Sequence, residues 1–162
     1  YLEGKGKNLA EMVDVPEDRC FGGFDAYKKL LASGVDAIVT AVLNLQTDED
    51  FRERGIHWPN VEESYRRLGL EVHRVPMRDF DPEDQRQHLP EAVKVLAGLL
   101  DSGRVTYLHC NAGTGRSQLV AMAYLHWYRK MGRKQAIEHV RDRRFCVSYE
   151  DLLKAGSKSG KH

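Results

Sequence analysis

A short apolar strand that runs directly into a glycine-containing loop and then into a helix constrains this chain more than any other feature. The strand is predicted over 105–108, and the loop that follows reads His109-Cys110-Asn111-Ala112-Gly113-Thr114-Gly115-Arg116-Ser117. A helical pattern begins at Arg116 or Ser117 and continues to about Met131, where Gly132 stops it. A strand, a tight loop and a helix in this order favour an α/β fold.

The rest of the sequence is consistent with that fold. Apolar periodicity and glycine stops predict helices over 25–33, 61–68, 81–103, 134–141 and 149–154, and strands over 35–43 and 70–75. The polar stretch 46–60 is expected to be a surface loop. Strands that alternate with helices imply a central, mostly parallel sheet flanked by helices on both faces.

The amount of apolar sequence is sufficient for one hydrophobic core. With 162 residues, of which 41% are hydrophobic, the chain is expected to form a single domain. We place this domain at 25–155, after an N-terminal segment of uncertain structure at 1–24. The low-complexity segment 156–162 is expected to be a flexible tail.

Composition argues against several classes of partner. Lys and Arg number 25 against 24 Asp and Glu, and a net charge of +1 does not indicate nucleic acid or a membrane surface. No apolar run approaches the roughly 20 residues of a membrane span. Any anion binding is therefore expected to be local. We also expect the chain to be a monomer. No leader opens the sequence, although it begins at Tyr1 and a removed targeting segment would not be visible.

The three cysteines, Cys20, Cys110 and Cys146, lack paired or metal-ligand spacing. This argues against a disulfide framework and a zinc site, and it indicates a reducing compartment. Cys20 and Cys146 also lack flanking glycines and a following arginine, so both are interpreted as structural thiols.

The loop itself has the composition of a phosphate-binding site. Gly113 and Gly115 allow a tight turn in which the backbone N–H groups of 111–115 point inward. Arg116 adds a planar bidentate fork, and the partial positive charge of the helix start faces the same pocket. Because the loop supplies the positive charge, no metal or other cofactor is expected.

The same positive field should make Cys110 a nucleophile. A thiolate is stabilised there, so we expect a depressed pKa. Attack on phosphorus would give a phosphocysteine, whose oxygens the loop amides and Arg116 would hold, and Ser117 could donate to the thiolate as it leaves. The alternative is that Cys110 is a buried core thiol in an ordinary turn, but the cysteine, glycines and arginine together are much more specific than a lone glycine motif.

Phosphate ester cleavage also needs a general acid, and acidic residues cluster between a predicted strand and the longest helix. Asp81 and Asp84 can both be explained as helix-start carboxylates. Asp79 lies one step earlier and is the better candidate.

These residues resemble the dual-specificity branch of the protein tyrosine phosphatase superfamily, which carries a Cys-x5-Arg loop and an upstream Asp. The segments that are most similar to its plant glucan phosphatases, the starch-excess proteins, are Leu43-Asn44-Leu45-Gln46, Arg78-Asp79-Phe80-Asp81-Pro82, Leu89-Pro90 and 105–110. The animal member of the group, laforin, shares Cys110-Asn111-Ala112-Gly113 and Gly115-Arg116-Ser117. The resemblance implies that Asp79 is the general acid and that Phe80 contacts the glucan chain. Thr114 departs from the family pattern, in which an aliphatic side chain is common at this position. Glu53 and Arg54 also depart from it, because they stand where the plant proteins have an aromatic pair. Trp58 could partly replace those aromatics in glucan binding, and both Phe80 and Trp58 could instead be partly buried packing residues.

Two substrate classes follow for the enzyme. The first is phosphorylated starch- or glycogen-like glucan, and the alternative is a phosphoprotein carrying phosphotyrosine, phosphoserine or phosphothreonine. An inositol-lipid phosphatase would need extra cations in the loop, where Thr114 is neutral. A binding module without turnover is disfavoured because the cysteine, arginine and acid are all present. A glucan phosphatase from a plant or alga would be expected in the chloroplast, and otherwise the cytoplasm is expected.

Overall fold

The computed structural model describes residues 39–143 and 145–158, all of which belong to one unit, Val39–His162. In this part of the chain the sheet contains β1 (Ala41–Asn44), β2 (Glu71–Arg74) and β3 (Thr106–His109) in the order β2-β1-β3. Both pairings are parallel, with Ala41 opposite Glu71 on one side and Thr106 on the other. The central strand β1 is completely buried, as its apolar sequence predicts.

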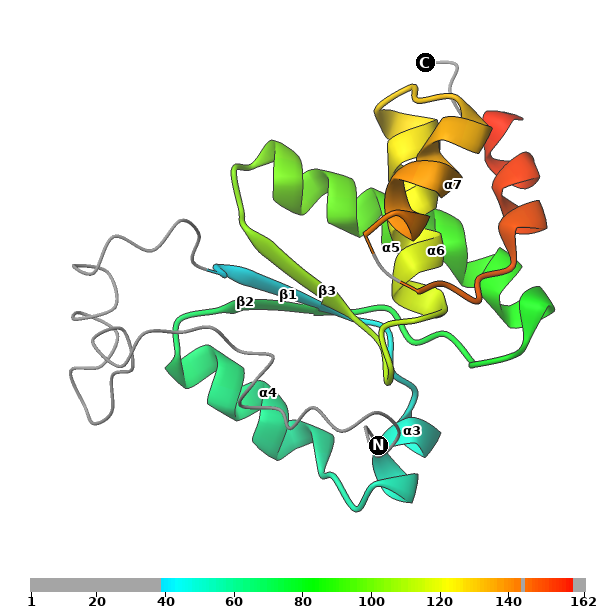
Figure 1. Cartoon of the computed structure of the whole chain (residues 1–162). Coiled ribbons are helices and arrows are strands. Elements are labelled where there is room, and N and C mark those ends of the chain that lie inside the picture. Colours follow the sequence, from blue (N-terminus) through cyan, green and yellow to red (C-terminus); the bar gives the residue numbers. More distant parts are fainter. Residues whose placement is uncertain (1–38, 144, 159–162) are drawn as a thin grey trace, which may run out of the picture. The chain divides into compact units, whose positions relative to one another are not determined.

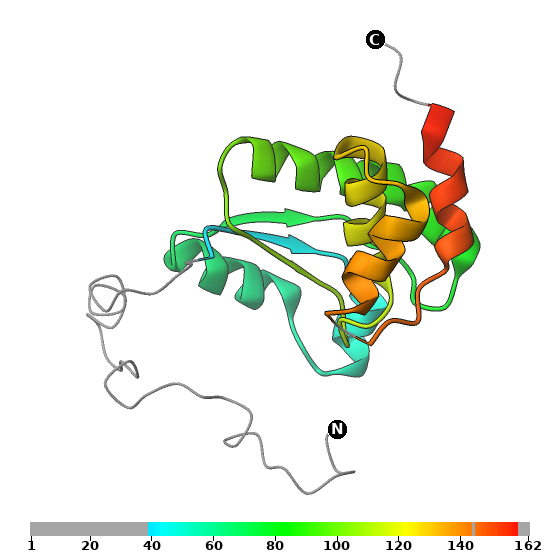
Figure 2. The same cartoon turned by 45° about the horizontal axis from the view of Figure 1, so that its top comes forward.

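Helices cover both faces of this sheet (Figure 1). One side carries α3 (Asp48–Glu53) and α4 (Trp58–Arg67), and the other carries α5 (Pro82–Asp101) and α6 (Arg116–Ala123). Figure 2 shows the same two layers from a second direction. The chain continues from α6 through a π-helical turn, η2 (Tyr124–Tyr128), to α7 (Arg133–Arg141) and the 3₁₀ helix η3 (Glu150–Lys158). The predicted α/β architecture is confirmed.

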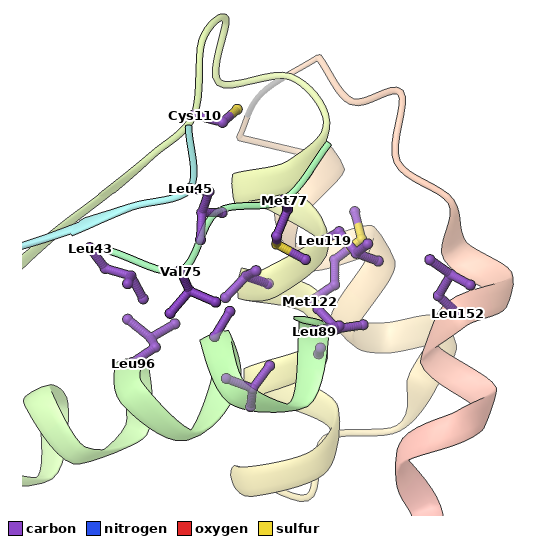
Figure 3. Packing of buried hydrophobic residues seen from close by; sticks show 14 of the residues in the cluster. Leu43, Leu45, Val75, Met77, Leu89, Leu96, Cys110, Leu119, Met122 and Leu152 are labelled. Carbon is purple, nitrogen blue, oxygen red and sulfur yellow. The ribbon is translucent and has the colours of Figure 1, made fainter. Parts of the chain in front are cut away.

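The hydrophobic core lies between the sheet and the helices α5 and α6. Figure 3 shows Leu43 and Val75 from the strand side of this cluster facing Leu89 and Leu96 of α5. Leu119 and Met122 of α6 are fully buried in the same cluster. Cys110 lies at the edge of the core, so the loop that contains it is fixed by the packing beneath.

Most predicted elements in the described residues are confirmed, with boundaries shifted by a few residues. The prediction of a surface loop over 46–60 is wrong, because this stretch forms α3 and the first turn of α4. Thr47 caps α3 through a capping box with Asp50, and Pro59 occupies the first turn of α4. The stretch was predicted to be a loop because the residues that begin these two helices are mostly polar.

Two further differences concern the ends of elements. The helix expected to reach Met131 ends its α-helical part at Ala123, and η2 completes it at Tyr128. The last helix is a 3₁₀ helix that runs beyond Lys154 as far as Lys158. The predicted helix over 25–33 and the beginning of the strand over 35–43 lie outside the described residues, and the division into 1–24, 25–155 and 156–162 stays a prediction.

Leu43→Ala should lower the free energy of unfolding by about 2–5 kcal/mol, because it removes a fully buried side chain from the central strand and leaves a cavity. The matched control is Leu68→Ala, since Leu68 is 74% exposed and its truncation should change stability by less than about 0.5 kcal/mol. Urea denaturation of both variants measures the difference, and equal losses would contradict the packing described here.

Candidate active site

The loop between β3 and α6 wraps one end of the sheet and places Cys110 at its base. Cys110 follows His109 at the carboxyl end of β3 and is 6% exposed. Gly113 adopts a positive φ of 66°, a conformation that side-chain-bearing residues rarely adopt. Gly115 then precedes α6, whose first residue is Arg116. The predicted order of strand, loop and helix is confirmed.

The surroundings of Cys110 favour its thiolate. Its Sγ lies 3.5 Å from the Ser117 Oγ. Burial alone would raise the pKa of the thiol, but hydrogen bonds from the Ser117 hydroxyl and from the backbone of Ser117 and Gly113, together with the Arg116 charge, outweigh burial and lower the pKa below its ordinary value. The lowered pKa expected for Cys110 is thus explained by named hydrogen-bond donors and by the Arg116 charge.

Arg116 is completely buried, and carboxylates from two other parts of the chain surround its guanidinium. Its Nη1 donates to Asp50 Oδ2 and to the Met77 carbonyl, both at 2.7 Å. Its Nη2 donates to Asp79 Oδ2 at 3.1 Å. The Arg116 Nε is a buried donor with no hydrogen-bond partner among the described residues. The arginine is therefore held firmly and keeps one donor uncommitted.

The three acidic residues between β2 and α5 have different surroundings. Asp81 caps α5, because its Oδ1 accepts hydrogen bonds from the Glu83 and Asp84 backbone N–H groups at 3.1 and 3.0 Å. Asp84 accepts from the Arg78 backbone N–H. Asp79 instead contacts Arg116 and lines the cavity above the loop. These contacts agree with the distinction drawn from the sequence, in which Asp81 and Asp84 are helix-start carboxylates and Asp79 is not.

Phe80 extends away from the protein beside Asp79. It is 76% exposed, and its backbone has a positive φ of 55°, which is a strained conformation for a bulky residue. Its N–H donates to Asp79 Oδ1 at 3.2 Å. An exposed phenylalanine on a strained backbone contributes little to folding, so Phe80 is not a core residue.

A cavity of about 380 Å³ opens above the loop. It is bounded by residues from the cysteine loop, from α3, from the Asp79 segment and from the segment before η3: Asp50, Glu53, Arg54, Asp79, Phe80, Gln85, Asn111, Ala112, Thr114, Gly115, Val147, Ser148 and Tyr149. Of the phosphate-binding residues predicted between Asn111 and Gly115, all except Gly113 are in this lining. Glu53 and Arg54, the two departures from the plant pattern, also line it.

Trp58 does not line this cavity. Its ring stacks on Phe51 with 5.1 Å between the centroids, and the Arg74 guanidinium lies 5.2 Å from its ring centre. The structure therefore places Trp58 in a half-buried stack on the α3–α4 side of the sheet and does not bring it together with Phe80.

Sequence analysis missed two groups of residues at this site. Asp50 fell in the stretch interpreted as a loop, although its spacing from Thr47 is that of a capping box and could have revealed the helix. The second group tethers the loop from the opposite side, where the Val147 N–H donates to the Thr114 carbonyl at 2.8 Å and Ser148 Oγ donates to the Gly115 carbonyl at 2.9 Å. No local pattern marks that second group.

No group of three His, Cys, Asp or Glu side chains in this part of the chain is placed to hold a metal ion. None of the helices described here has both the length and the apolar character needed to cross a membrane.

Comparison with known proteins finds relatives that cover half or more of this chain. Over 98 residues the chain is 36% identical to Laforin of Mus musculus, covering 55% of this chain and 30% of that protein. Over 121 residues it is 31% identical to the amyloplastic phosphoglucan phosphatase DSP4 of Castanea sativa, covering 74% of this chain and 32% of that protein. The chain thus spans about a third of the length of these curated relatives.

A solved structure and a family description cover most of the chain. The structure of Tk-PTP in the active form superposes with a TM-score of 0.59 at 26% identity, covering 72% of this chain and 76% of that one. Residues 28–155 match the catalytic domain of the dual specificity phosphatases. With Cys110, Arg116 and Asp79 converging at one end of a parallel sheet, the chain belongs to the dual specificity phosphatase family, as a cysteine-based catalytic domain of it.

Proposed function

We propose that this domain hydrolyses phosphate monoesters on a starch- or glycogen-like glucan, through a phosphocysteine at Cys110. The observation that carries the glucan assignment is Phe80, a 76%-exposed aromatic ring at the mouth of the cavity beside Asp79. The name of the Castanea sativa relative, a phosphoglucan phosphatase, supports the same assignment.

Substrate binding uses the loop and its arginine. The backbone N–H groups of Asn111, Ala112, Gly113, Thr114 and Gly115 surround the phosphate oxygens, and the guanidinium of Arg116 adds charge-assisted donors. Arg116 Nε supports this role, because it has no acceptor among residues 39–143 and 145–158. A buried donor without an acceptor is costly, and an entering phosphate oxygen would satisfy it.

The chemistry proceeds in two steps. The Cys110 thiolate attacks phosphorus and forms the S–P bond while the ester P–O bond breaks, and Asp79 gives its proton to the leaving sugar oxygen. Water then attacks phosphorus, Asp79 takes a proton from that water, and the S–P bond breaks to release inorganic phosphate. Ser117, 3.5 Å from Sγ, donates to the thiolate as it re-forms.

The cavity walls are suited to a sugar carrier. Phe80 and Tyr149 present aromatic surface that can stack on the apolar face of a glucose unit, and Val147 adds aliphatic surface. Glu53 and Arg54 offer an acceptor and donors for hydroxyl groups. Starch or glycogen is then the partner, in the chloroplast of a plant or alga and otherwise in the cytoplasm.

A phosphoprotein substrate is the second candidate. The charged pair Glu53 and Arg54 favours it, because these residues replace the aromatic surface that a glucan chain would contact with groups that suit a peptide. The chemistry of the loop is the same for both carriers, so only the cavity rim distinguishes them.

Asp79→Asn should lower kcat by about 10²–10⁴-fold on substrates with poor leaving groups, because the leaving oxygen loses its proton donor. The loss should be much smaller on an activated aryl phosphate, whose leaving group needs little protonation. Steady-state kinetics on alkyl and aryl phosphates measure this contrast. Asp81→Asn is the comparison variant, and a larger loss there than in Asp79→Asn would move the general acid to Asp81.

Phe80→Ala should reduce phosphate release from solubilised phosphoglucan by about twofold to tenfold, since one aromatic contact of roughly 0.5–1.5 kcal/mol is lost. Hydrolysis of a small aryl phosphate should be nearly unchanged. The control is Tyr128→Ala, which removes an aromatic ring that is 48% exposed and does not line the cavity. A phosphopeptide is assayed in parallel. Unchanged glucan activity in Phe80→Ala, with faster turnover of the phosphopeptide, would favour the protein substrate.

A further inference from the structure

Asp50 is the residue that joins the parts of this site, although it was not expected there. Its Oδ2 accepts from Arg116 Nη1 at 2.7 Å, and its Oδ1 accepts from Arg116 Nη2 at 3.4 Å. Oδ1 also accepts from the Asn111 side-chain amide, and Oδ2 accepts from the Thr47 backbone N–H at 2.7 Å. Because the Thr47 hydroxyl also donates to Oδ2 at 3.0 Å, Oδ2 has three donors and Oδ1 has two. Two of the donor residues, Asn111 and Arg116, belong to the phosphate-binding loop.

The position of Asp50 is fixed by its own helix. Asp50 stands in the first turn of α3, and its carboxylate closes the capping box with Thr47. Because α3 begins just beyond the carboxyl end of β1, its first turn lies next to the loop that leaves the neighbouring strand β3. A carboxylate held this way cannot follow the arginine if the arginine moves.

Asn111 is held by the same carboxylate. Its Nδ2 donates to Asp50, while its Oδ1 accepts from Gln46 Nε2 at 2.6 Å. Asn111 is the first loop residue after Cys110, so fixing its side chain also fixes the start of the loop. Asp50 and Gln46 together connect the loop to the segment that leaves β1.

The two carboxylates on Arg116 differ in exposure and in the segment that carries them. The Asp50 side chain is 11% exposed, whereas that of Asp79 is 34% exposed and lies in a segment between elements. Asp79 must reach the leaving oxygen during the reaction, so it cannot be the permanent partner of the arginine. Burial alone would raise the pKa of Asp50, but hydrogen bonds from Arg116 and Thr47 outweigh burial and lower it, so the carboxylate stays charged.

We propose that Asp50 is a positioning residue that holds the Arg116 guanidinium and Asn111 in the geometry required to bind phosphate. This inference rests on the proposed phosphatase function but not on the glucan assignment. It deepens that function by naming a residue that acts through Arg116 and does not itself touch the substrate.

The affinity for inorganic phosphate tests the proposal, because the two possible roles of Asp50 predict changes in opposite directions. A negative charge near an anion site weakens anion binding by Coulomb repulsion, so Asp50→Asn should tighten phosphate binding if Asp50 acts only as a charge. If Asp50 positions Arg116, the same variant should weaken binding by about tenfold, because a charge-assisted contact to phosphate is lost or misaligned. Calorimetric titration of inorganic phosphate into Cys110→Ser, with and without Asp50→Asn, measures the change.

The phosphate titration does not require turnover, so it tests the role of Asp50 even if the domain acts on none of the assayed substrates. The matched control is Asp48→Asn, the same substitution in the same helix at a side chain that is 79% exposed and pairs with Arg74. Phosphate affinity should be unchanged there. Unchanged or tighter phosphate binding in Asp50→Asn would overturn the proposal, and so would equal weakening in both variants.

Asp50→Glu and a double-mutant cycle separate positioning from simple support of the fold. Glutamate suits the same capping-box position, so Asp50→Glu should keep the melting temperature while it displaces the carboxylate. It should lower kcat/KM for an aryl phosphate by about 100-fold.

In the double-mutant cycle, adding Asp50→Asn to Arg116→Lys should lower kcat/KM by less than about threefold more, because the arginine that Asp50 orients is already gone. Parent-like kinetics in a folded Asp50→Glu, or fully multiplicative losses in the cycle, would contradict the proposal.

Discussion

The structure depends on the burial of one positive charge, that of Arg116. A guanidinium removed completely from water is costly unless carboxylates and carbonyls surround it. Asp50 and the Met77 carbonyl satisfy Nη1, and Asp79 contacts Nη2. These partners follow β1 and β2, while Arg116 follows β3 through the loop. Folding the domain and assembling its site are therefore the same event, because the charge can be buried only when all three strands are paired.

The parallel sheet explains why these groups meet. In a parallel sheet the carboxyl ends of neighbouring strands lie at one edge, where ligands usually bind. The segment after β1 supplies Asp50, the segment after β2 supplies Asp79, and the segment after β3 supplies Cys110. The segment before η3 completes the enclosure by binding the carbonyls of Thr114 and Gly115. Both contacts use carbonyl groups of the loop and none of its N–H groups.

The parts of the site that sequence could predict are local ones. Cys110, the glycines, Arg116 and Ser117 lie within one strand–loop–helix unit, so their spacing alone defines their arrangement. Asp79 was separable from Asp81 and Asp84 because helix starts have a recognisable pattern of carboxylates. Asp50 was missed because a short polar helix looks like a loop, and its link to Arg116 joins residues far apart in the sequence. The stack of Trp58 with Phe51 and Arg74 could not be predicted from the sequence either, because it depends on how α4 packs against β2.

The central claim is that the loop converts Cys110 into the group that receives phosphate. Its most direct test is rapid acid quenching of the protein during turnover of an aryl phosphate, followed by digestion and mass spectrometry of the cysteine-containing peptides. The account predicts one phosphoryl group on the peptide containing Cys110, with no phosphoryl group on the peptide containing Cys146. Turnover without a phosphorylated Cys110, or with the phosphoryl group on another residue, would contradict it.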